Sequence, residues 1–263
     1  MNYLDIYPEL QNVKWCDLIR ISKWKVAREI LLPLPFLIIS LVLLAKTYFF
    51  AALFSLFFFF LTGLRLSHNA QHNIVGCNRK GCDWILFILS PLMMNSMHAV
   101  QVTHLRHHNL CLTPEDEEGH CAKMPFYQAL FYGPLFTINM HLNALKYGNP
   151  KQVRWIKLEL FTELSFLVLS LLSGILTLQI FVISMLIANC LTAFFCVWLV
   201  HYGCDGIDKV SRTIRSPLIN KISFNMFLHV EHHLFPQIPT CNLDTLSERI
   251  DEVSDRFKKN SVF

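Results

Sequence analysis

The feature that most constrains this chain is a stretch of 41 residues, 164–204, that contains no Asp, Glu, Lys or Arg. A helix that spans a bilayer needs about 20 apolar residues. The stretch therefore has room for two spans joined by a tight hairpin near Ser173 and Gly174. A second apolar block, residues 30–64, is interrupted only by Lys46 and has room for two more spans.

The alternative is a pair of core hairpins buried inside a soluble protein. Of the 263 residues, 53% are hydrophobic, against roughly 45–50% in a soluble domain. Two such hairpins leave too few polar residues to cover them in a chain of this length. We therefore predict one all-α integral membrane domain, residues 1–263, with four transmembrane helices in two hairpins and a helical cap that holds the polar chemistry. The predicted spans are 27–45, 47–66, 156–174 and 176–200, and the predicted cap comprises 67–155 and 201–263.

The basic residues predict the orientation of these spans. They are spread over the N-terminal segment and the cap, whereas the two hairpin tips carry only Lys46. The positive-inside bias then places both termini and the whole cap in the cytoplasm. A net charge of +4 favours an anionic membrane surface, and it is too small and too dispersed to indicate nucleic-acid binding.

The cap itself is predicted to contain shorter elements. Residues 83–97 are apolar but too short to span, which indicates a buried or re-entrant segment. Residues 114–119 (PEDEEG) form an acidic loop, residues 125–148 an aromatic-rich helix at the membrane interface, and residues 243–257 an amphipathic helix.

Histidines are grouped in a way that indicates metal binding. Of the 12 histidines, eight fall into three clusters: HNAQH at 68–72, HLRHH at 104–108 and HVEHH at 229–233. On a helix, the spacings i, i+3 and i+4 put side chains on one face, one turn apart. The candidate ligands are His68, His72, His104, His107, His108, His229, His232 and His233.

The number of these imidazoles predicts two metal ions. Protonated imidazoles this close repel one another, whereas neutral imidazoles bound to a cation do not. Eight ligands exceed the four of one tetrahedral zinc. Imidazole accepts Zn, Cu, Fe and Ni, so spacing alone predicts a polyhistidine site for two metals and leaves the metal open. Cys77 and Cys82 are weaker candidate ligands, because the nine cysteines contain no CxxC pair.

The three clusters, in this order and interleaved with two apolar hairpins, resemble the histidine boxes of the membrane fatty acid desaturase and hydroxylase superfamily. The resemblance covers about residues 30–245, and HVEHHLFPQIP at 229–239 is similar to the third box of acyl-lipid desaturases. It implies that the eight box histidines bind two iron ions, Fe2+ or Fe3+, with O2 as cosubstrate. It also implies no catalytic group beyond the metal ligands.

The same resemblance implies an activity and its partners. Members of the superfamily remove hydrogen from an unactivated C–H bond of a lipid or acyl-carrier substrate. Electrons arrive singly from an external donor, a ferredoxin or a small haem protein with its reductase. The expected function is therefore that of an oxidoreductase that introduces a double bond into a fatty acyl chain.

Four histidines lie outside the boxes, and one of them has a place in the superfamily pattern. Relatives commonly have a ninth histidine at the cytoplasmic end of the last span, where this chain has His201 in WLVHYG. A histidine at membrane depth is functional by default, so His201 is predicted to be a ninth ligand, the alternative being a histidine that only reaches the interface. His98, His120 and His141 are predicted to be solvated or hydrogen-bonded.

Departures from the superfamily pattern concern residues around the ligands. Asn69 follows the first histidine of box one, where many desaturases have an acidic residue, and Val197 stands where some relatives have Asn. Groups that orient metal ligands affect the reaction. Glu231, inside box three, either orients an imidazole or faces water.

Other functions remain open at this point. A hydroxylase of fatty acyl, sphingoid, carotenoid or alkane substrates has boxes like these. A membrane metal transporter also gathers histidines, but it places ionisable residues at mid-membrane, and the apolar stretches have none. A bis-histidine haem carrier uses isolated histidines that face each other rather than adjacent His-His pairs.

Overall fold

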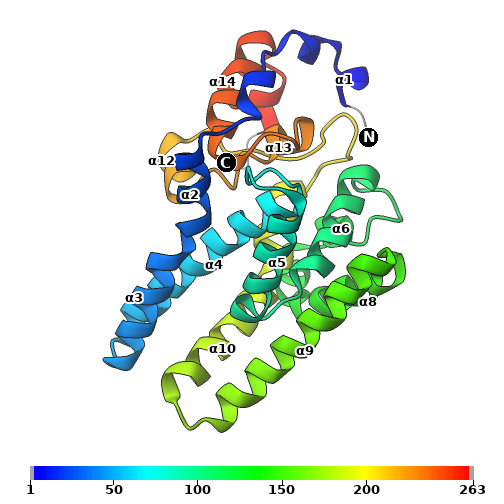
Figure 1. The fold of residues 1–263 in the computed structure, drawn as a ribbon. Helices are drawn as coiled ribbons and strands as arrows, with labels where there is room; N and C mark the ends of the chain where they lie inside the picture. Colours follow the sequence, from blue (N-terminus) through cyan, green and yellow to red (C-terminus); the bar gives the residue numbers. More distant parts are fainter. Residues whose placement is uncertain (1–2, 261–263) are drawn as a thin grey trace. The chain divides into compact units, whose positions relative to one another are not determined.

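The computed structural model describes residues 3–260, and all regular elements in that range are helices (Figure 1). The longer helices are α2 (Lys23–Leu31), α3 (Pro33–Ala45), α4 (Phe49–Gln71), α5 (Arg79–Met93), α6 (Met97–Leu110), α8 (Gly133–Tyr147), α9 (Pro150–Leu172), α10 (Leu176–Cys190) and α14 (Leu243–Val253). The shorter ones are α1 (Tyr3–Ile6), α7 (Phe126–Phe131), α11 (Leu199–His201), α12 (Pro217–Ile222) and α13 (His229–Leu234). Between them lies one π-helix, Ala193–Trp198. Five short 3-10 helices are also present: Pro8–Asn12, Cys16–Leu18, Gly119–Lys123, Thr240–Asn242 and Phe257–Asn260. The prediction of an all-α chain is confirmed.

The chain divides into two compact units. The first unit combines Met1–Ile21, His104–Tyr132 and Thr192–Phe263, and the second combines Ser22–Thr103 and Gly133–Leu191. Helix α6 begins in the second unit and ends in the first. Two of the three histidine boxes therefore belong to the first unit, and box one belongs to the second.

Three helical segments are long and apolar enough to cross a membrane. They are Lys23–Ala45, Phe49–Gln71 and Leu176–His201, which correspond to the predicted spans 27–45, 47–66 and 176–200. A fourth candidate arises if the bent pair α5 and α6 counts as one span.

The predicted span 156–174 lies in α9, which is not among these segments. Helix α9 carries two buried carboxylates, Glu159 and Glu163, so this hairpin is not free of ionisable residues. Its exposed residues include three basic ones in the first two turns (Lys151, Arg154 and Lys157) and are apolar from Leu158 onward, with Phe161 and Leu172 among them.

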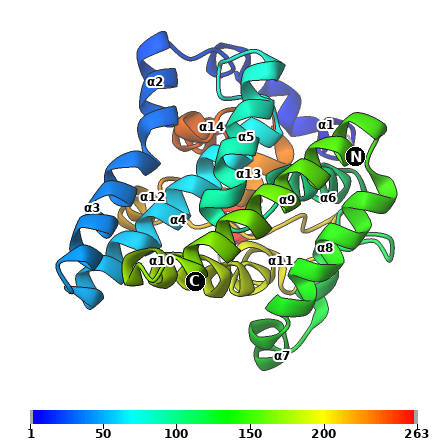
Figure 2. The same cartoon turned by 60° about the horizontal axis from the view of Figure 1, so that its bottom comes forward.

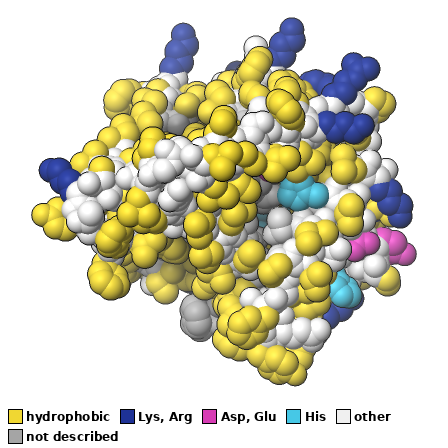
Figure 3. Space-filling model, turned by 90° about the horizontal axis from the view of Figure 1, so that it is seen from below, with side chains coloured by type: hydrophobic (Ala, Val, Ile, Leu, Met, Phe, Trp, Pro, Cys, Tyr) yellow, Lys and Arg dark blue, Asp and Glu magenta, His cyan; other side chains and the backbone are white. Residues whose placement is uncertain are grey.

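The first hairpin, α3 with α4, is held by contacts that its apolar sequence provides. Figure 2 shows the two helices side by side. The Ser55 hydroxyl donates a hydrogen bond of 2.9 Å to the carbonyl of Phe36, and the Phe36 ring stacks on Phe58. Phe50, 92% exposed at the start of α4, illustrates the apolar outer surface. Apolar side chains also dominate the face of the molecule in Figure 3, as expected for a surface that lipid covers.

The second hairpin, α9 with α10, turns where the sequence predicts, whereas α9 begins at Pro150, before the predicted span 156–174. Asn149 caps α9 in a reciprocal box with Gln152, and Pro150 occupies its first turn. The turn between Leu172 and Leu176 contains Gly174 at φ +70°, a conformation that favours glycine. The predicted tip near Ser173 and Gly174 is confirmed.

Helices α5 and α6 meet at a bend of 113°. Met94 at the bend adopts φ +53°, and the Asn189 amide of α10 donates hydrogen bonds of 2.6 and 3.2 Å to the carbonyls of Met93 and Met94. These bonds satisfy backbone groups that the interrupted helix leaves free. The bend agrees with the prediction of a buried or re-entrant segment before box two.

The core of the first unit brings both ends of the chain together. Tyr7 and Leu10 of the N-terminal segment pack in one buried cluster with Val230 of α13 and with Leu246 and Ile250 of α14. The apolar face of α14 is the amphipathic face that the sequence predicts. Because α13 lies in this core, box three is built into packed structure rather than into a loop.

Candidate metal centre

Box two occupies the second half of α6. His104, His107 and His108 are all buried, and the rings of His104 and His108 are 4.7 Å apart, as expected for residues one helical turn apart. The prediction that this spacing gathers imidazoles on one helical face is confirmed.

Box three forms the short helix α13, with His232 and His233 buried. Glu231 on this helix is fully buried and accepts a hydrogen bond of 2.8 Å from Thr213. It also pairs with Arg215, which holds Asp251 of α14 at 2.8 Å. Glu231 is therefore shielded from water, and its contacts with Thr213 and Arg215 tie box three to the core of the first unit.

Four histidines of the first unit converge on one point. Their Nε2 atoms lie 3.1 Å apart between His107 and His201, 3.0 Å between His201 and His229, and 3.2 Å between His229 and His233. One ligand atom from each of the four lies within 4.8 Å of every other. An imidazole binds a metal ion at ~2.0–2.1 Å, so nitrogens at right angles around one ion are about 3.0 Å apart. The arrangement fits a single metal ion.

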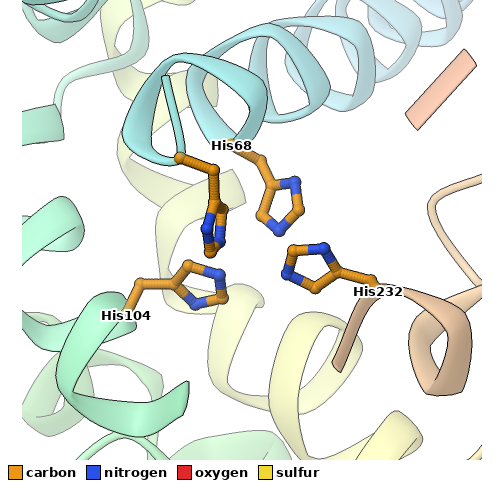
Figure 4. Close-up of side chains that lie close together, drawn as sticks. His68, His104 and His232 are labelled. Atoms are coloured by element: carbon orange, nitrogen blue, oxygen red, sulfur yellow. The ribbon is translucent and has the colours of Figure 1, made fainter. Parts of the chain in front are cut away.

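Three other histidines of the same unit form a second convergence. The Nε2 of His108 lies 3.2 Å from that of His104 and 2.8 Å from that of His232. The rings of His104 and His232 are 5.8 Å apart and nearly parallel (Figure 4). These separations also fit ligands on a common ion.

Box one lies at the end of α4 in the second unit. His68 projects from the last turn of α4 (Figure 4), and its ring is 5.1 Å from that of His72. Helix α4 continues past its apolar part into box one, as the sequence predicts. Gln101 of α6 donates a hydrogen bond of 3.0 Å to the carbonyl of Gln71, beside His72.

Two carboxylates contact box two. Asp116 Oδ2 lies 2.7 Å from Nδ1 of His107, and Glu118 Oε1 lies 3.0 Å from Nδ1 of His104. The sequence predicts only an acidic loop for both residues. The signal that it does contain is a run of four acidic residues, 115–118, that follows box two closely.

Burial and neighbouring groups shift the pKa values at this site in different directions. Burial, together with the charges of His108 and other neighbouring histidines, lowers the pKa of His233 well below its ordinary value. Burial alone would also lower the pKa of His107, but the hydrogen bond to Asp116 and the nearby carboxylate charges raise it. Burial opposes ionisation of Asp116, yet hydrogen bonds from His107 and two backbone amides lower the pKa of that carboxyl. Asp116 is therefore ionised, and His233 is neutral.

The remaining histidines belong to neither convergent group. His120 is exposed, and His141 is hydrogen-bonded through Nδ1 to the carbonyl of Thr137. His98 is buried and pairs with Glu159 at 2.5 Å. His201, in contrast, belongs to the four-histidine group.

Comparison with known proteins identifies the family. A model of the fatty acid desaturase family matches residues 44–260. The chain belongs to the fatty acid desaturase family. The matched region of this desaturase family member contains all three boxes and His201. No curated protein and no solved structure matches the chain.

Family membership and the apolar helices together establish the broad class. This member of the desaturase family is an integral membrane protein with three to four candidate spans. Its family is one of membrane oxidoreductases, and its histidines form groups able to hold metal.

Proposed function

We propose that the protein is an O2-dependent oxidoreductase with two irons that introduces a double bond into the acyl chain of a lipid or acyl-carrier substrate. The observation that carries this proposal is the convergence of His107, His201, His229 and His233 within 4.8 Å, in a member of the desaturase family. Imidazoles gathered this closely repel one another when protonated, and binding of a shared metal ion to their neutral forms removes that repulsion.

The proposed ligands are nine histidines. His107, His201, His229 and His233 would hold one ion. His68, His72, His104, His108 and His232 would hold the other, with box one assigned by the family resemblance and by its spacing of one turn. When bound, the two irons supply the activation of O2 and the removal of hydrogen from an unactivated C–H bond. The chain's own residues hold the ligands, keep them neutral and exclude water.

The proposed topology has four spans with both termini and all boxes in the cytoplasm, where an external electron donor, a ferredoxin or a small haem protein, delivers electrons. An even number of crossings is supported because the segments 104–132 and 192–263 carry boxes two and three, in which Nε2 of His108 lies 2.8 Å from Nε2 of His232. Those segments are separated by α8, α9 and α10. Helix α10 continues into an apolar segment long enough to span. An even number of crossings then requires a second span between these segments, and we assign it to α9.

The substrate class is tested by lipid analysis. The full chain is expressed in a host with a defined fatty acid composition, and total acyl chains are compared by mass spectrometry with those of cells carrying His107→Ala. We expect products two mass units lighter only with the unaltered chain. Products sixteen units heavier would instead assign a hydroxylase, and unchanged lipids in several hosts would remove support for the activity.

Metal content is tested on anaerobically purified protein. By site capacity and family, we expect about two irons per chain, with His107→Ala losing metal while it stays in the membrane. Stoichiometric haem, or one zinc without iron, contradicts the proposal.

A further inference from the structure

The acidic loop after box two alternates between two environments. Glu115 and Glu117 are exposed, whereas Asp116 is buried and Glu118 is largely buried. A loop whose acids all served solubility would expose all of them. The two that turn inward are the two that reach box two.

Asp116 is held firmly by its own loop. Besides its contact with His107, its carboxylate accepts hydrogen bonds from the backbone N–H groups of Leu112 at 2.7 Å and Gly119 at 3.0 Å. Leu112 adopts φ +61°, which turns its N–H toward the loop. A Cβ at residue 119 would lie 2.3 Å from Asp116 Oδ2, so glycine at this position leaves room for the carboxylate.

Glu118 is held more loosely. Its Oε1 contacts His104, while its Oε2 is buried without a hydrogen-bond partner among residues 3–260. The two carboxylates thus provide the same type of contact with different rigidity.

Both carboxylates contact Nδ1 of their histidine, on the side away from the convergent Nε2 atoms. A carboxylate beside Nδ1 keeps the ring proton there and leaves the lone pair on Nε2 for a metal. It also fixes the ring orientation and makes the imidazole a stronger electron donor to the metal.

We propose that Asp116 and Glu118 are positioning residues, one for each metal ion. Asp116 orients His107 toward the ion of the four-histidine group, and Glu118 orients His104 toward the other ion. The inference rests on the proposed function, because it requires that the boxes bind metal. Since Asp116 has backbone anchors and Glu118 has none, the two ions receive ligands of unequal rigidity.

The experiment uses purified full-length protein reconstituted with 57Fe. Iron affinity and Mössbauer spectra are compared for the unaltered chain, Asp116→Asn and Glu118→Gln, with Glu115→Gln and Glu117→Gln as matched controls from the exposed positions of the same loop. We expect Asp116→Asn to lower iron affinity by about 10–100-fold and to change the signal of one iron. Glu118→Gln should change the signal of the other iron, and both controls should match the unaltered chain.

The outcomes separate this inference from the proposed function. If the unaltered chain binds no iron, the proposed function fails. If it binds two irons and both inner variants have unchanged affinity and spectra, only the positioning role is overturned. If both variants change the same iron, the assignment of one carboxylate to each ion is wrong. Among residues 3–260 the Glu118 carboxylate accepts no backbone N–H, unlike that of Asp116, so Glu118→Gln keeps the inference testable even if Asp116→Asn fails to fold.

Discussion

At the residue scale, spacing identified the box histidines, but the groups that orient them depend on tertiary contacts. The intervals i, i+3 and i+4 on one helix predict which imidazoles share a face, and His104, His107 and His108 do so in α6. The Asp116 carboxylate that contacts His107 also accepts the N–H of Leu112, which has φ +61°, and a Cβ at residue 119 would lie 2.3 Å from it. No periodicity in the sequence encodes such a loop.

His201 and His141 provide a matched test of ligand and non-ligand histidines. His201→Ala removes a nitrogen that lies 3.1 Å from that of His107 and 3.0 Å from that of His229. We expect a loss of iron affinity of at least 10–100-fold, as for loss of a group that supports a metal site. The His141 side chain is hydrogen-bonded to the carbonyl of Thr137 in its own helix. The His141→Ala variant should therefore keep the iron. Elemental analysis of both variants checks this, and full iron retention in His201→Ala would show that eight histidines suffice.

His98 has a different role from the other histidines outside the boxes. Its Nδ1 lies 2.5 Å from Glu159, which also accepts a hydrogen bond of 2.6 Å from Ser96, and its ring stacks on Trp155. Removing one partner of a buried hydrogen bond leaves the other polar group unsatisfied, which costs about 1–3 kcal/mol. We expect His98→Ala to lower the free energy of unfolding by about 1–3 kcal/mol.

The control for this prediction is His120→Ala, because His120 is exposed and a surface change stays within about 0.5 kcal/mol. Unfolding in detergent is followed by circular dichroism with increasing denaturant. Equal stability of the two variants would mean that the His98–Glu159 contact contributes little.

At the element scale, the sequence predicted helices and hairpin tips better than bends. The turn at Gly174 follows from local chemistry, and so does the capping of α9 by Asn149. The 113° bend between α5 and α6 depends on Asn189, which is distant in sequence. The carboxylates of α9 were not expected inside a span, and Glu159 is stabilised there by contacts with Ser96 and His98.

Close approach of α8 and α10 depends on one glycine. A Cβ on Gly133, the first residue of α8, would lie 1.6 Å from the carbonyl oxygen of Cys190. A backbone carbonyl cannot rotate away as a side chain can, so Gly133→Ala must move the two helices apart. We expect the free energy of unfolding to fall by about 3 kcal/mol or more. Gly81→Ala is the control, since its Cβ would meet only side-chain atoms of Cys77 and Asn78, at 3.1 Å or more. Thermal unfolding midpoints of both variants check this; similar midpoints would contradict the packing argument.

At the scale of the whole molecule, composition predicted a membrane protein, but the number of crossings depends on α9. From Leu158 onward the exposed residues of this helix are apolar, and its two carboxylates are buried, so average hydropathy understates how well it suits a membrane. Boxes two and three give a stronger constraint, because Nε2 of His108 lies 2.8 Å from Nε2 of His232. Under the proposed topology the two boxes therefore lie on one side of the membrane, and the chain between them crosses an even number of times.

This parity gives a test that distinguishes four spans from three. With four spans, Lys46→Cys and Ser173→Cys, at the exposed hairpin tips, react with a membrane-impermeant thiol reagent in intact cells. The native Cys16, which is exposed, then reacts only after permeabilisation and serves as the internal control for cytoplasmic orientation. With three spans, α10 crosses the membrane and α9 does not. Ser173→Cys then reacts only after permeabilisation. The partly exposed native Cys204 and Cys241 instead react in intact cells. That second pattern would put boxes two and three on opposite sides of the membrane and exclude the common metal site that their histidines form.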